Sequence, residues 1–67
     1  MQIEIGKTYL TREGERITIE HITPFPQGTW VVQGIDERGR ITWRSRKGRF
    51  TNYPHPLDLV REAPPLA

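Results

Sequence analysis

The fold is decided by a stretch near the N-terminus, Lys7-Thr8-Tyr9-Leu10-Thr11-Arg12-Glu13-Gly14-Glu15-Arg16-Ile17-Thr18-Ile19-Glu20. Its second half alternates apolar and polar residues, and a strand points such successive side chains to opposite faces. Gly14 lies between the halves, where the chain must reverse and a positive φ suits glycine. The stretch therefore predicts a β-hairpin of two strands, 7–11 and 16–20, with Ile17 and Ile19 facing the core.

The remainder of the chain has the same character. We expect further strands at 30–35 and 40–45, and a short strand near 49–51. The segment 21–29 contains two prolines and a glycine, which predict a loop because proline lacks the ladder N–H. Residues 57–60 fit either a single helical turn or a last short strand. Short strands divided by Gly and Pro turns predict an all-β protein, either a small barrel or a strongly bent antiparallel sheet of about five strands.

Length and composition limit the organisation of the chain. Its 67 residues suffice for one domain, which we place at 1–62 with a flexible tail at 63–67. The absence of cysteine excludes disulfides and thiolate metal sites. No apolar run approaches the ~20 residues that cross a bilayer, and the N-terminus lacks the basic and apolar regions of a signal peptide. We therefore expect a soluble, cytoplasmic protein that does not bind membranes.

The charge is concentrated in one segment. The net charge is only +2, but residues 38–49 contain six basic residues and no acidic one. On a strand, the alternation there predicts that Ile41 and Trp43 enter the core while the cations and Thr42 face outward. The candidate binding residues of this strand and its turn are Arg40, Arg44, Arg46, Lys47 and Arg49.

Two interpretations of this basic strand remain open. Arginine suits phosphate oxygens, and small β-barrels bind nucleic acid by combining such cations with exposed rings, here Phe50, Tyr53 or Trp30. Polar side chains also belong on the outer face of any half-buried strand, where acids such as Glu20 or Glu37 could pair with them.

Two aromatic residues outside this strand are further binding candidates. Phe25 lies between two prolines, and a stiff loop with an aromatic tip makes a good interface anchor; the alternative is that Phe25 covers one end of the core. Tyr53 would extend the same apolar patch. Trp30 and Trp43 are expected in the core, although exposure of either beside the basic strand would make it an interface candidate.

Catalysis and metal binding have little support. Ser45 is the single serine, and a catalytic triad would have to recruit a distant histidine, His21 or His55. Two histidines so far apart, without a third strong ligand at suitable spacing, match no zinc pattern. We therefore expect a protein that is not an enzyme and has no catalytic residue, no metal ligand and no cofactor.

Three segments of the chain resemble a group of small phage and prophage-encoded proteins of unknown function. They are Lys7-Thr8-Tyr9-Leu10-Thr11-Arg12-Glu13-Gly14, Gly48-Arg49-Phe50 and His55-Pro56-Leu57-Asp58-Leu59-Val60. The resemblance implies a compact SH3-like β fold and a bacterial or phage source, and it implies no activity.

These observations lead to one expected function and one alternative. The expected function is a non-catalytic phage or prophage accessory module that binds a host or phage protein in the bacterial cytoplasm. The alternative is a small nucleic-acid-binding β-barrel that uses the basic strand 40–49. Homodimerisation through an edge strand would also stabilise so short a chain.

Overall fold

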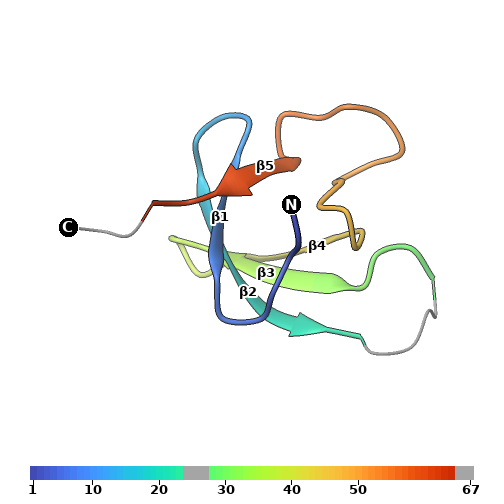
Figure 1. The fold of residues 1–67 in the computed structure, drawn as a ribbon, viewed down its shortest axis with the longest axis horizontal. Coiled ribbons are helices and arrows are strands. Elements are labelled where there is room, and N and C mark those ends of the chain that lie inside the picture. The colour runs from blue at the N-terminus through green and yellow to red at the C-terminus, as the bar shows by residue number, and fades with distance from the viewer. Residues whose placement is uncertain (24–27, 65–67) are drawn as a thin grey trace.

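The protein forms one antiparallel sheet of five strands, seen in a computed structural model that describes residues 1–23 and 28–64 (Figure 1). The strands are β1 (Thr8–Thr11), β2 (Arg16–Ile22), β3 (Val32–Asp36), β4 (Ile41–Arg44) and β5 (Leu59–Glu62). Their order across the sheet is β4-β3-β2-β1-β5. No helix occurs in the described ranges. The expected all-β class is confirmed.

Three turns of the same design organise the chain. Each begins with a short polar residue and has a glycine of positive φ in fourth place; the five-residue segments are 11–15, 36–40 and 45–49. In each turn the glycine N–H donates to the carbonyl of the first residue, and the first N–H donates to the carbonyl of the fifth. The side-chain oxygen of Thr11, Asp36 or Ser45 also accepts the N–H of the fifth residue. This is a type I turn closed by a residue in the left-handed region, a common three-residue hairpin loop.

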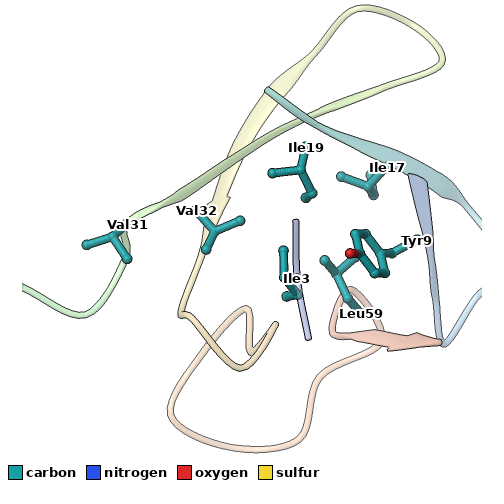
Figure 2. Close-up of a cluster of buried hydrophobic side chains, with 7 residues drawn as sticks. All are labelled: Ile3, Tyr9, Ile17, Ile19, Val31, Val32 and Leu59. Atoms are coloured by element: carbon teal, nitrogen blue, oxygen red, sulfur yellow. The ribbon is translucent and has the colours of Figure 1, made fainter. Parts of the chain in front are cut away.

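The core lies inside the bend of the sheet (Figure 2). Its members come from the N-terminal segment, β1, β2, the start of β3 and β5, and they are Ile3, Tyr9, Ile17, Ile19, Val31, Val32 and Leu59. The Tyr9 hydroxyl accepts the N–H of Glu4 at 2.8 Å and donates to the carbonyl of Gln2 at 3.0 Å. The Tyr9 side chain thus packs its ring in the core and holds the N-terminal segment over the core through its hydroxyl.

The orientation of β4 is opposite to the sequence-based prediction. Ile41 and Trp43 are 47% and 51% exposed, whereas Arg44 is 1% exposed. The register explains this inversion, because Arg44 pairs with Val32 and Trp43 pairs with Gln33. Residues opposite each other in a ladder share a face, so the inward position of Val32 carries Arg44 inward too.

Two further elements differ from expectation at the C-terminal end. Residues 49–51 form no strand, because the chain bends away after the third turn. The alternatives for 57–60 resolve in favour of a strand, β5, which begins at Leu59 and pairs with β1. The Leu59 N–H donates to the Gly48 carbonyl at 2.9 Å, so the end of the third turn contacts the opposite edge of the sheet.

The predicted tail begins inside the described residues. The Ala63 N–H donates to the Thr8 carbonyl at 2.9 Å, and the Pro64 carbonyl accepts from Arg16. The rest of the predicted tail, 65–67, lies outside the described residues.

Candidate binding surface

The cations predicted as one outward patch lie in four different environments. Arg40 forms an ion pair with Asp36, with 2.8 Å between Nε and Oδ2. Arg44 is inside the sheet. Arg49 lies beside the buried Asp58, its Nε 3.5 Å from Oδ2. Arg46 and Lys47 are exposed at the third turn, where Arg46 donates to the Thr23 carbonyl at 2.8 Å. Of the five predicted cations, Arg46 and Lys47 are therefore the two that the structure leaves exposed without an ion pair among the described residues, since the exposed Arg40 is paired with Asp36.

Arg44 is buried because distant groups accept its hydrogen bonds. Its Nε donates to the Leu57 carbonyl at 2.9 Å and its Nη1 to the Thr42 hydroxyl at 2.7 Å. The guanidinium lies 5.3 Å from the centroid of the Phe50 ring, within cation–π range. Burial lowers the pKa of Arg44, and the negative charges of Asp58 and Glu15 act against that shift. This arginine holds the β4–β5 connection against the sheet.

Asp58 fixes the other side of that connection. Its Oδ1 accepts the Phe50 N–H at 2.7 Å and its Oδ2 accepts the His55 N–H at 3.1 Å. Burial by itself raises the pKa of Asp58, but the two backbone donors and the guanidinium groups of Arg49 and Arg12 outweigh it, so the pKa is lowered. Asp58 thus both accepts backbone N–H groups of the connection and pairs with arginine.

The side chains that β4 presents instead form an apolar strip. Ile41 and Trp43 point away from the core on the last strand of the sheet, and Ile35 and Gln33 are their partners on β3. Because paired residues share a face, Ile35 adjoins Ile41 and Gln33 adjoins Trp43. Gln33 in turn donates to Glu20 at 3.3 Å. We call Ile35, Ile41 and Trp43 the β4 surface.

Sequence reasoning missed this surface, although a signal was present. The turn at 36–40 fixes the register of β3 and β4. Had the polar Gln33 been placed outward, that register would have put Trp43 outward beside it and Arg44 inward. The alternation of residues in β4 shows which side chains share a face, but it does not show which of the two faces is buried.

The other aromatic candidates lie apart from the β4 surface in the sequence. Trp30, predicted in the core, is 41% exposed just before β3. Tyr53 is 63% exposed in the β4–β5 connection, with its ring centroid 6.4 Å from that of His55. Phe50 is half-buried, with the Arg44 guanidinium 5.3 Å and the His55 ring centroid 4.7 Å from the centroid of its ring. Phe25 lies outside the described residues.

The described residues contain no group of three or more His, Asp or Glu side chains that could hold a metal ion. Among the same residues, no helix is long and apolar enough to cross a membrane. In comparisons with known proteins, no family model, curated protein or solved structure matches this chain. Its function has to be inferred from the surfaces described above.

Proposed function

We propose that this protein is a non-catalytic binding module whose contact with a protein partner is the β4 surface. The observation that carries the proposal is the exposure of Ile41 and Trp43 side by side on an edge strand. Tryptophan is among the residues that contribute most to interfaces, where its large rigid ring is removed from water. Other large apolar side chains of this small domain are also exposed, but Ile41 and Trp43 share one face of a single strand, and such a cluster favours a binding role.

A protein partner is favoured over nucleic acid because of the cations. Arg44 is inside the fold, and Arg40 and Arg49 lie beside carboxylates. Of the five predicted cations, Arg46 and Lys47 are the two that are exposed without an ion pair among the described residues, which is few for a groove that tracks a phosphate backbone.

The resemblance to small phage and prophage proteins supports an accessory role, with a host or phage protein as the partner in a bacterial cytoplasm. The strand order, with β5 beside β1 and β4 at the far edge, is compatible with the SH3-like fold that the resemblance implies.

Affinity capture from a bacterial lysate treated with nuclease tests the proposal. We expect the parent protein to retain a partner that Trp43→Ser loses at least tenfold, since a buried hot-spot tryptophan contributes about 2 kcal/mol or more. Val60→Ser is the matched control, because Val60 is also exposed but lies on β5 at the opposite edge. Equal capture by all three proteins would contradict the β4 surface as the interface.

The alternative is a single-stranded nucleic acid stacked on Trp43. It is favoured by one observation, the proximity in sequence of that exposed ring to the accessible Arg46 and Lys47. Two phosphate contacts would give a log–log salt slope of about −1.4 in an anisotropy titration with a labelled oligonucleotide. Binding that shows this slope and is lost in Trp43→Ser would replace the protein partner with nucleic acid.

A further inference from the structure

Among the described residues, the backbone N–H and C=O groups of β4 form ladder hydrogen bonds only on the side that faces β3. In an antiparallel ladder, alternate residues direct their N–H and C=O groups to the same neighbour. The Asp36 N–H donates to the Arg40 carbonyl, and the register then places Thr42 opposite Gly34 and Arg44 opposite Val32 as hydrogen-bonded pairs. The N–H and C=O groups of Ile41 and Trp43 therefore point away from β3, toward the free edge of the sheet.

The chain after the third turn pairs with the end of β4 at one residue only and then bends away. The Ser45 N–H donates to the Arg49 carbonyl, so Arg49 lies beside the end of β4 as the first residue of a returning strand would. The Phe50 N–H donates to Asp58, and residues 50–53 form a bend rather than a strand paired with Trp43. Within the described residues, nothing pairs with the edge groups of Ile41 and Trp43.

Space is available on both faces beside this edge. On the outer face the edge is flanked by the exposed side chains of Ile41 and Trp43. On the inner face lies a cavity of about 450 Å³ whose lining includes Thr42, Arg44 and Leu57 together with the carboxylates of Glu15 and Asp36. A strand added to the edge would alternate its side chains between the two faces. One set would contact the β4 surface, and the other set would enter the cavity.

The charge around the edge determines which occupant fits. Arg46 and Lys47 follow β4 and are exposed. Before β4 the charges are mixed, because Arg40 is paired with Asp36 and Glu37 adjoins Arg38. An acidic segment would meet opposite charge at the C-terminal end of β4, where Arg46 and Lys47 are exposed.

We propose that the free edge of β4 receives an extended, acidic segment of a partner protein as a sixth strand. The segment pairs with the N–H and C=O groups of Ile41 and Trp43 and lays apolar side chains on the β4 surface. Main-chain bonds would then hold the partner while the flanking side chains select it. This inference rests on the proposed function and specifies the form of its partner.

Site-resolved amide hydrogen exchange tests the pairing directly. The probe is a short blocked peptide of alternating valine and aspartate, with the same peptide carrying lysine for aspartate as its charge control. We expect saturating acidic peptide to slow exchange at Ile41 and Trp43 at least tenfold, while Thr42 and Arg44 stay protected with and without it. Unchanged exchange at Ile41 and Trp43, or equal protection by the lysine peptide, overturns the proposal.

Backbone substitutions supply an independent test. Ile41→Pro removes one edge-facing N–H and leaves the β3–β4 ladder intact, since proline is tolerated where the N–H faces away from the sheet. We expect it to weaken peptide binding at least tenfold relative to Ile41→Val. If circular dichroism shows that Ile41→Pro does not fold, two N-methylated peptides replace it. One is methylated at an N–H that would face β4, and the other at an N–H that would face away from it. Equal binding of these two peptides overturns the proposal.

Other occupants give different results. Protection of Ile41 and Trp43 that rises with protein concentration and needs no peptide would assign the edge to self-association and overturn the acidic segment. An oligonucleotide that quenches Trp43 without slowing amide exchange would do the same in favour of nucleic acid. A protein partner that requires the Trp43 side chain but leaves exchange unchanged would keep the proposed function and overturn the sixth strand.

Discussion

Asp58 shows how one carboxylate can organise a long connection. Its two oxygens hold the backbone N–H groups of Phe50 and His55, and the guanidinium groups of Arg12 and Arg49 lie 3.7 and 3.5 Å from Oδ2. A buried carboxylate is stable only when donors and cations compensate for lost hydration. Asp58 thereby holds the start of the β4–β5 connection, which bends at residues 50–53.

The lowered pKa of Asp58 predicts acid-sensitive stability. A group whose pKa is lower in the folded state stabilises the fold above its unfolded value of about 3.9, and the contribution is lost as the pH falls through the folded value. We expect the free energy of unfolding in urea to fall below about pH 5 and the fall to be shallower in Asp58→Asn. Glu13→Gln controls for the change in net charge. Parallel curves for the parent and Asp58→Asn would contradict this role.

At the scale of elements, the same turn is used three times with different results. The turns at 11–15 and 36–40 each join two full strands, whereas the turn at 45–49 joins β4 to a segment that pairs for one residue. The third turn also makes a tertiary contact that the second does not. An added Cβ on Gly48 would lie 3.1 Å from Leu59 Cβ and 3.2 Å from Ile3 Cδ1, while one on Gly39 would meet nothing within 4 Å.

Alanine substitutions at these two glycines separate conformation from packing. Both have a positive φ, +84° at Gly48 and +82° at Gly39, so alanine costs each about 1 kcal/mol. Gly48→Ala must also displace the core, and we expect a total loss of about 2–3 kcal/mol in the free energy of unfolding. Denaturation of the two variants side by side measures the difference. Equal losses in the free energy of unfolding would show that Leu59 and Ile3 move aside at little cost when a Cβ is added at Gly48.

The whole molecule is held together by a core to which nearly every segment contributes. Ile3 reaches that core from the N-terminal segment, which is fastened by the Tyr9 hydroxyl and by the Gly6 N–H donating to the Ile19 carbonyl at 2.8 Å. Ile5, two residues later, is exposed. In so small a domain each buried side chain is a sizeable part of the total stability.

Substitution of the two isoleucines tests this assignment. Ile3→Ala leaves a void in the core, and we expect it to lower the free energy of unfolding by about 2–4 kcal/mol. Ile5→Ala removes an exposed side chain, and its effect should stay within about 0.5 kcal/mol. Thermal or urea unfolding monitored by circular dichroism gives both values. A loss from Ile5→Ala equal to that from Ile3→Ala would contradict the described packing of the N-terminal segment.

Much of the fold could be predicted from local sequence. The first hairpin, the inward Ile17 and Ile19, and the reversals near Gly14 and Gly39 follow from alternation and turn chemistry, which act over a few residues. The candidate site was predicted less well. The cations of the basic strand have different partners, and those partners include Asp58 and Leu57, residues on the far side of a long connection.

The sequence by itself determined that Ile41 and Trp43 share one face of a strand and that Arg44 lies on the other, because side chains alternate with a period of two. Only the tertiary structure decided which face is buried. Burying Arg44 requires acceptors, and these come from the Leu57 carbonyl and the Thr42 hydroxyl, with the Phe50 ring beside them. A buried guanidinium without such partners would be too costly, and no local pattern reveals a partner that lies 13 residues away. The exposed Trp43, and with it the proposed binding surface, is a consequence of that long-range compensation.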